Sequence, residues 1–187
     1  MRDEYIIVLD FLARGKADAR RAEPTVQGIG NTYFNLLEVV LKPGVMVKPG
    51  DVLYIGEGER DKVKYIKGRI RYDELTSFAK EELERVLDEI IEKNEKRFVN
   101  FFNVAGPVSP RLHSLELLPG IGKKHMWSII EERKKKKFES FEDLKKRVEM
   151  LPDPKRMIKR RIIEELKETD RHRLFVPRRP SRLQTPR

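Results

Sequence analysis

The chain has 187 residues, of which 39% are hydrophobic and 39% are charged, and it contains no cysteine. This length allows one ordinary domain or two small ones, and the lack of thiols excludes disulfides, thiolate zinc sites, iron–sulfur clusters and cysteine nucleophiles. The net charge of +10 comes from the C-terminal half, because residues 1–103 hold 18 Lys and Arg against 19 Asp and Glu whereas residues 104–187 hold 23 against 12; such a localised excess indicates a polyanion-binding protein.

The N-terminus carries acidic residues before a short apolar run that lacks a small-residue cleavage site. We therefore expect a cytosolic protein. An anionic membrane surface would also attract the basic half, but the apolar residues never form a run of about 18.

Five short runs of β-type residues, each bounded by Gly, Pro, Asn or Asp, predict strands at 5–12, 25–29, 33–41, 51–55 and 63–72. Two Pro-Gly pairs, at Pro43 and Pro49, favour type II turns between the third and fourth strands. Residues 1–76 are thus predicted to form a small five-stranded β-barrel that resembles an OB-fold, a common nucleic-acid platform.

Strict alternation along the fifth strand would place Tyr65, Lys67, Arg69 and Arg71 on one face. One aromatic residue among three cations suits a platform on which single-stranded bases stack. An edge strand protected by charge explains the same pattern equally well.

From residue 77 the apolar period becomes helical, and Ser77 is the expected N-cap of a connecting amphipathic helix over 77–103. Its other face is acidic and is expected to meet solvent or, as an alternative, to dock a basic protein partner along 77–94. The acidic residues are Glu81, Glu82, Glu84, Asp88, Glu89 and Glu92.

Gly106, Pro107 and Pro110 mark a predicted domain boundary at 103–110, and an all-α domain is expected over 104–169. Its helices are predicted at 114–118, at 123–135, after the N-cap candidate Ser140, and around Ile158 to Leu166. Residues 170–187 are rich in Arg and Pro and predict a basic, disordered tail.

The segment Leu118-Pro119-Gly120-Ile121-Gly122-Lys123-Lys124 places two glycines, one residue apart, just before a helix. Glycine permits a tight turn and a close approach to a ligand. The free amides and positive dipole at the start of the helix favour an anion, and Lys123 and Lys124 add charge there. Ile121 is expected to point inward as the apolar anchor.

This segment resembles the helix-hairpin-helix family, whose pattern is an apolar residue, Pro, Gly, an apolar residue and Gly before a helix with an inward Ile, here Ile129. Met126 stands where the family usually has Ala. The resemblance implies a hairpin whose amides hold DNA or RNA phosphates without reading bases. It also implies a monovalent cation at the hairpin carbonyls near Leu118 and Gly120. An ordinary Gly-rich connection without a ligand is the alternative.

Such modules commonly occur in pairs, and residues 147–156 lie where a second, degenerate hairpin is expected, with Pro and Asp in place of the glycines. Its possible phosphate contacts are Lys155, Arg156, Lys159, Arg160 and Arg161, although a solvated basic face is an equal alternative. Further expected phosphate contacts are His125 and the run Lys134, Lys135, Lys136 and Lys137, which follows Arg133 and also complements the helix dipole.

Evidence for an enzyme is weak. No two of the three histidines stand at metal-ligand spacing, and the glycine segment lacks the spacing and the Ser or Thr of a P-loop. A DNA glycosylase or lyase is the sharpest alternative. In that superfamily a Lys at the position of Lys124 forms a Schiff base, and an acidic residue such as Glu142 or Asp143 lies downstream.

The order of modules is similar to that of the bacterial Holliday-junction-binding helicase partner. Across nearly the whole chain, the closer resemblance is to an archaeal family called domain of unknown function 655, which combines an OB-like part with this hairpin module. We expect a non-enzymatic protein that binds the phosphate backbone of DNA or RNA independently of sequence but selectively for nucleic-acid structure, with support from the barrel face and with no cofactor. An adaptor in a nucleic-acid-processing or ribosome-related complex is the second hypothesis.

Overall fold

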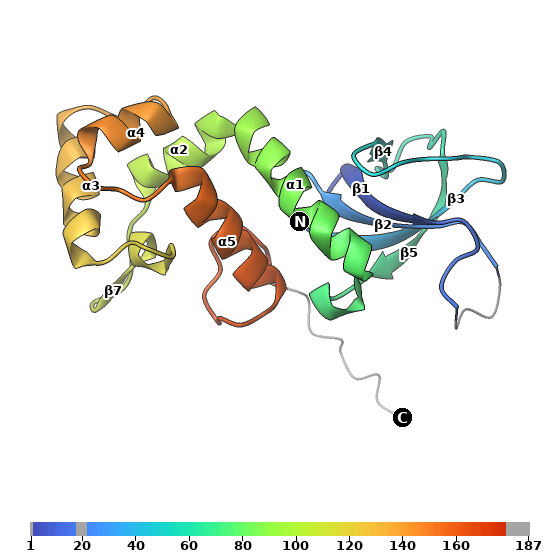
Figure 1. Ribbon diagram of the computed structural model, residues 1–187. Coiled ribbons are helices and arrows are strands. Elements are labelled where there is room, and N and C mark those ends of the chain that lie inside the picture. Colours follow the sequence, from blue (N-terminus) through green and yellow to red (C-terminus); the bar gives the residue numbers. More distant parts are fainter. Residues whose placement is uncertain (1, 18–21, 179–187) are drawn as a thin grey trace.

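A computed structural model describes residues 2–17 and 22–178 and shows a mixed α+β architecture, as predicted. A curled antiparallel sheet forms one end of the molecule and the helices extend from it toward the other end (Figure 1). The sheet contains β1 (Tyr5–Leu12), β2 (Thr25–Gly30), β3 (Leu36–Leu41), β4 (Val52–Tyr54) and β5 (Val63–Arg69). The strand order is β4-β1-β2-β3-β5, and β4 and β5 are not paired with each other in the part of the chain that the structure describes. The sheet is therefore a half-barrel.

Both faces of this sheet are covered, which explains why every residue of β2 and β3 is buried. The inner face of the curl carries one apolar cluster, which includes Ile6, Val39 and Leu53. The other face contributes Leu9 and Ile29 to a larger cluster shared with the helices.

Helix α1 (Ser77–Lys93) packs between the sheet and the C-terminal helices (Figure 1). Its N-cap is Thr76 and not Ser77 as predicted, because the Thr76 hydroxyl accepts from the Ala79 amide at 3.0 Å and donates to Asp10 at 2.6 Å. A short turn, η1 (Tyr72–Glu74), precedes it. The single helix predicted over 77–103 is two helices, since α2 (Glu95–Val104) begins after a break at Asn94.

The C-terminal half follows the predicted helices closely. It contains η2 (Ser114–Leu117), which is a 3-10 turn, then α3 (Lys123–Lys135), α4 (Phe141–Arg147) and α5 (Pro154–Leu166). Ser140 caps α4 as predicted, with its hydroxyl 3.0 Å from the Asp143 amide. A two-stranded ribbon of β6 (Pro107–Ser109) and β7 (Leu112–His113) interrupts the predicted all-α pattern at the expected boundary. The larger apolar cluster runs through this boundary, from the sheet to α5.

The prediction of a disordered tail from residue 170 is wrong for residues 170–178, which pack against α5. The carboxylate of Glu165 accepts from the backbone amides of Leu174 at 2.6 Å, Phe175 at 3.0 Å and Val176 at 2.8 Å. The ring of Phe175 also lies 5.6 Å from that of Phe98 between centroids. Apolar side chains and a buried carboxylate thus hold this segment, whereas the rest of the predicted tail, 179–187, lies outside the described residues.

Candidate nucleic-acid interface

The segment 118–124, here called the first hairpin, forms a tight turn before α3. The Ile121 amide donates to the Leu118 carbonyl at 3.1 Å, and Gly120 between them has a φ of +95°. Ile121 is only 6% exposed, so it points into the core as predicted. The two glycines on either side of Ile121 therefore have different roles, since Gly120 makes the turn and Gly122 begins the helix.

The N-terminus of α3 is open to a ligand. Gly122 supplies no side-chain cap, and the first helical bond joins the Met126 amide to the Gly122 carbonyl at 3.0 Å. The amides of Lys123, Lys124 and His125 donate to no acceptor within residues 2–17 and 22–178. Unsatisfied amides at the positive end of a helix favour an anion. Gly122, Lys123 and Lys124 are all exposed beside them.

Lys123 is held by a carboxylate next to the hairpin. Its ammonium lies 2.9 Å from Glu116, and this hydrogen bond lowers the pKa of Glu116. His113 stands on the same turn, where its Nδ1 accepts from the Leu115 amide at 3.1 Å. Burial, together with the charge of Arg133, lowers the pKa of His113. Of the two lysines, Lys124 therefore carries the charge that is not paired within the described chain.

Residues 148–154, here called the second hairpin, repeat the turn of the first. The Leu151 amide donates to the Val148 carbonyl at 3.4 Å, and Met150, just before Leu151, has a φ of +55°. Met150 thus takes the place of Gly120, where Pro or Asp was expected. The two hairpins also touch, because a Cβ atom on Gly120 would lie 3.3 Å from Pro152. The two turns are therefore packed on each other, and their assignment as a helix-hairpin-helix pair stays a prediction.

The second hairpin differs from the first at the helix that follows it. Asp153 caps α5 and accepts from the Lys155 amide at 3.3 Å, and Pro154 at the first helical position has no amide to offer. An acidic cap occupies the position that an anion would take. This helix start is therefore closed, whereas the start of α3 is open.

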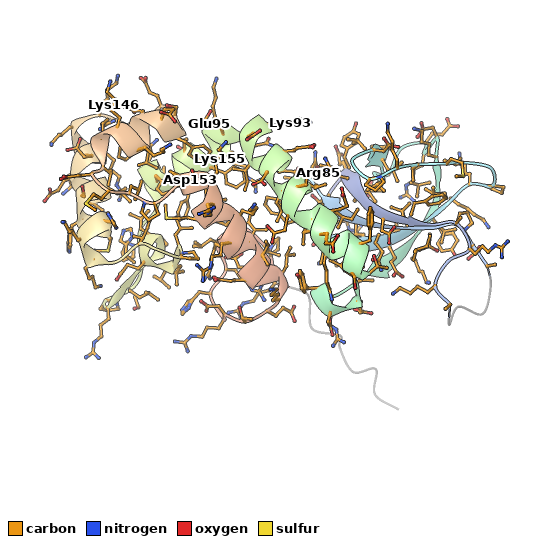
Figure 2. All side chains as sticks on the ribbon, in the orientation of Figure 1. Arg85, Lys93, Glu95, Lys146, Asp153 and Lys155 are labelled. Carbon is orange, nitrogen blue, oxygen red and sulfur yellow. The ribbon has the colours of Figure 1, made fainter. Side chains whose placement is uncertain are left out.

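Three of the five cations predicted around the second hairpin are engaged inside the chain. Lys155 lies 2.8 Å from Glu92, and Lys159 lies 3.0 Å from Asp88, both on α1. Figure 2 shows Asp153 and Lys155 at the start of α5 and Lys93 at the end of α1. Arg161 is 3% exposed and bonds Glu165 at 2.9 Å, so the prediction that it contacts phosphate is wrong.

The other two remain at the surface. Arg160 lies 3.4 Å from Glu164, and Arg156 has no ion pair among the residues that the structure describes. The acidic face of α1 was expected to meet solvent or a protein partner, but part of it pairs with α5. Glu84, for example, lies 3.3 Å from Lys159. This face and α5 neutralise each other in part.

The lysine run at the end of α3 is exposed. Lys135 pairs with Glu132 at 2.5 Å and Lys136 with Glu139 at 3.2 Å, while Lys134 and Lys137 make no ion pair in the described residues. Arg133 turns inward and donates to the Phe102 and Ala105 carbonyls at 3.1 and 2.8 Å. The run therefore offers charge at the surface, but Arg133 has a structural role.

The predicted stacking face of β5 is not assembled. Two register shifts in the pairing of β3 with β5 place Tyr65 opposite Val40 but Arg69 opposite Leu37. Opposed residues share a face, and Leu37 and Val40 are three apart, so Tyr65 and Arg69 lie on opposite faces.

The neighbouring groups are held by carboxylates. The Tyr65 hydroxyl donates to Glu23 at 2.6 Å, Lys67 pairs with Glu38 at 3.6 Å, and Arg71, beyond the strand, pairs with Asp73 at 3.1 Å. Although burial opposes ionisation of Glu38, hydrogen bonds from Lys16 and Gln27 keep its pKa below the ordinary value. Because of the bulges, the side chains of β5 do not alternate strictly between two faces, and these ion pairs occupy several of its cations. The predicted stacking face is therefore wrong.

A concavity of about 470 Å³ opens beside β4 and β5. Leu37, Ile55 and Ile66 are among its apolar lining residues. Its charged lining consists of Arg2, Asp3, Glu4, Glu57, Arg60 and Arg69, three cations against three carboxylates. This balance gives no preference for an anion, so the first hairpin is the better candidate.

Comparison with known proteins supports the whole-chain resemblance. The family model described as "Protein of unknown function (DUF655)" matches residues 2–177. The chain belongs to the DUF655 family. The uncharacterized protein MJ0038 of Methanocaldococcus jannaschii is 47% identical over 176 residues, covering 93% of this chain and 80% of the relative. The crystal structure of Af1531 from Archaeoglobus fulgidus, of the same family, superposes with a TM-score of 0.86 at 47% identity, over 94% of this chain and 100% of that one.

In this DUF655 chain the residues of the lyase alternative do not come together. Arg147 bonds the Glu132 carbonyl at 2.6 Å and Asp143 at 3.2 Å, which places Asp143 at the C-terminal end of α3. Lys124 lies in the first turn of α3, about 12 Å from Glu132 along the helix at 1.5 Å per residue. Glu142 pairs with Lys145 at 3.3 Å. The geometry thus offers no acid or base to Lys124 from these residues.

No group of three or more His, Asp and Glu in the described ranges could hold a metal ion, and no helix there is long and apolar enough to cross a membrane. The carbonyl of Leu118 already accepts from Ile121 at 3.1 Å, which leaves one lone pair for the predicted monovalent cation. That cation, with Gly120 as a second ligand, stays a prediction.

One surface residue of the DUF655 chain escaped the sequence analysis. Trp127 on α3 is 56% exposed, next to the buried Met126 and close to the buried Ile129. The sequence could have indicated this exposure, because the helical spacing places Trp127 away from the face that carries Met126 and Ile129.

Proposed function

We propose that this DUF655 protein binds the phosphate backbone of DNA or RNA, without catalysis and without reading sequence, through the first hairpin and the start of α3. The observation that carries the proposal is the contrast between two similar turns. The helix after the first begins with open amides beside Lys124, and the helix after the second begins with Asp153 and Pro154. Backbone amides that meet phosphates distinguish no bases.

Within this proposal the two hairpins form a helix-hairpin-helix pair with one active member, and the half-barrel is an OB-like accessory module. The basic excess of residues 104–187 supports the proposal, because it increases attraction to the backbone and makes affinity depend on salt. Lys134 on the same helix and Lys137 just after its end add positive charge to this surface.

The adaptor hypothesis receives less support. Glu84, Asp88 and Glu92 are paired with α5, and Arg85 lies 2.7 Å from Glu82 and 2.5 Å from Glu89, so most of the acidic face is already neutralised within the chain. A basic partner at 77–94 would have to displace these contacts.

The sharpest test gives the start of α3 an acidic N-cap like that of α5. Gly122→Asp places a capping carboxylate where an anion would bind. The backbone there is extended, and no atom lies within 4 Å of the position that a Cβ would take. We expect this variant to fold with unchanged or slightly higher stability, because Asp caps a helix at least as well as Gly. We expect it to lose at least tenfold in affinity for labelled single-stranded and duplex DNA and structured RNA.

The matched control is Gly122→Ala, which adds a Cβ but no charge and leaves the amides open. It should retain the affinity and the salt dependence of the wild type. Equal affinity of the wild type and Gly122→Asp across a salt titration would contradict the proposal.

A further inference from the structure

Trp127 is the single tryptophan of the sequence, and its side chain stands at the surface of α3. Tryptophan offers a large apolar area, and leaving it in water forgoes the stabilisation that burial would supply. Nothing in the packing of α3 requires it, because Met126 and Ile129 already supply the buried contacts of this helix. An exposed tryptophan in this position is therefore better explained by a ligand than by folding.

The surroundings of Trp127 identify the chemistry of that ligand. Lys123 and Lys124 precede it by four and three residues, so they lie on the same side of the helix, one turn toward the open amides. Glu131 follows one turn later, and Lys134 follows two turns later. Ile130, the one apolar residue at this spacing, is partly buried against the core, so the neighbours of the ring along the helix are mostly charged and mostly basic and do not form a broad apolar patch such as an interface with another protein would present.

We propose that Trp127 stacks on an unpaired base of a single strand or bulge whose neighbouring phosphate is held at the start of α3. This inference rests on the proposed function and specifies its substrate class. One helical turn advances about 5.4 Å, which suits the separation between a phosphate and the base of an adjacent nucleotide. Every base has a π-face, so stacking adds affinity for unpaired nucleotides without adding sequence preference. Paired bases present no such face except at a duplex end.

Because the chain has one tryptophan, its fluorescence reports on this site alone. The wild-type protein is titrated with short oligothymidylate and oligouridylate, with an abasic strand of the same length and charge, and with a capped duplex hairpin. The anisotropy of an end label on each nucleic acid measures binding independently. We expect the strands with bases to quench the emission of Trp127, and the abasic strand and the duplex to bind with little quenching.

Variants separate stacking from charge. Trp127→Ala should lose about tenfold in affinity for oligothymidylate and oligouridylate but keep its affinity for the abasic strand and the duplex. Trp127→Phe should recover most of the loss. The control is Met46→Ala, which removes an exposed apolar side chain from the half-barrel and should change neither measurement.

Binding of all strands with equal affinity and no quenching by those with bases would overturn the stacking role and leave the phosphate clamp standing. Equal quenching by the abasic strand would also overturn it, since charge alone would then account for the signal. Absence of an anisotropy change with every nucleic acid would overturn both proposals.

Discussion

Gly120 packs directly on Pro152, since a Cβ atom built on Gly120 would stand 3.3 Å from Cγ of Pro152 and 3.8 Å from the sulfur of Met157. This contact joins the two hairpins, which are thirty residues apart in the chain. The turn that precedes α3 therefore packs directly on the turn that precedes α5. The contact and the φ of +95° both restrict this position to glycine.

Gly120→Ala is expected to destabilise the protein by about 1–2 kcal/mol, because a side chain is unfavourable at this φ and Pro152 must yield. Denaturant unfolding followed by circular dichroism measures the loss. Gly106→Ala is the matched control, because Gly106 has no positive φ and no atom lies within 4 Å of the position that a Cβ would take. Equal stability of the two variants would show that the hairpin contact is not tight.

Met150 occupies the equivalent place in the second hairpin with a φ of +55°, and it is 84% exposed. A non-glycine residue pays a conformational penalty here without burying its side chain. Met150→Asn should stabilise the protein by about 0.5–1 kcal/mol, since Asn tolerates this conformation better. The thermal midpoint should therefore rise, while Met46→Asn in an exposed loop should leave it nearly unchanged. A lower midpoint for Met150→Asn would contradict this account.

Glu165 is fully buried and binds both Arg161 and the segment 174–176. Glu165→Gln weakens the hydrogen bonds from three backbone amides and leaves the buried Arg161 with the Asp170 carboxylate at 3.0 Å, so we expect a loss of about 3 kcal/mol in the free energy of unfolding. Protease sensitivity after residue 170 should rise as the segment detaches. Glu164→Gln at the surface pair with Arg160 should cost less than about 1 kcal/mol. A similar small cost at Glu165 would mean that the buried pair contributes little.

Stability should also depend on the ionisation of Asp170. Its carboxylate accepts from the His172 amide at 2.8 Å and from Arg161 at 3.0 Å. The hydrogen bond from the His172 backbone, with help from Arg161, lowers the pKa of Asp170 from 3.8 to about 2. Because the folded state holds the proton more weakly than the unfolded state, this stabilisation is fully present above about pH 4. It disappears as the pH falls through about 2.

Asp170→Asn should therefore be less stable than the wild type by about 1 kcal/mol at neutral pH, after allowance for the partial exposure of the side chain. The difference should shrink toward zero near pH 2. Urea titrations across this range measure it, with Asp73→Asn at an exposed pair as the control. A difference that stays constant with pH would exclude the carboxylate charge as its source.

Much of the local structure could be predicted because its causes lie within a few residues. The helical spacing of Leu83, Val86 and Leu87, the cap at Ser140 and the turn at Gly120 each depend on neighbours along the chain. Because these causes are local, the predicted N-cap of α1 was wrong by only one residue. Thr76 and Ser77 are both good caps, and only the contact of Thr76 with Asp10 favours the first.

The ion-pair partners of the charged residues could not be predicted from neighbours along the chain. Lys155 and Lys159 look like phosphate contacts until α5 is placed beside α1, where Glu92 and Asp88 bind them. Arg161 belongs to the same basic run, yet it is buried against Glu165. Bulges in β5 likewise depend on the pairing with β3, so they leave no clear mark in a single strand.

The sequence by itself determined the α+β class, the helices of the C-terminal half and the turn of the first hairpin, because backbone preference and apolar periodicity act locally. Only the tertiary structure decided which cations are free, since a charge is neutralised by whatever lies near it in space. It also showed that two similar hairpins start different helices, one open at Gly122 and one closed by Asp153. That difference, together with the exposed ring of Trp127, gives the basic half a specific place to hold a nucleic acid in our proposal.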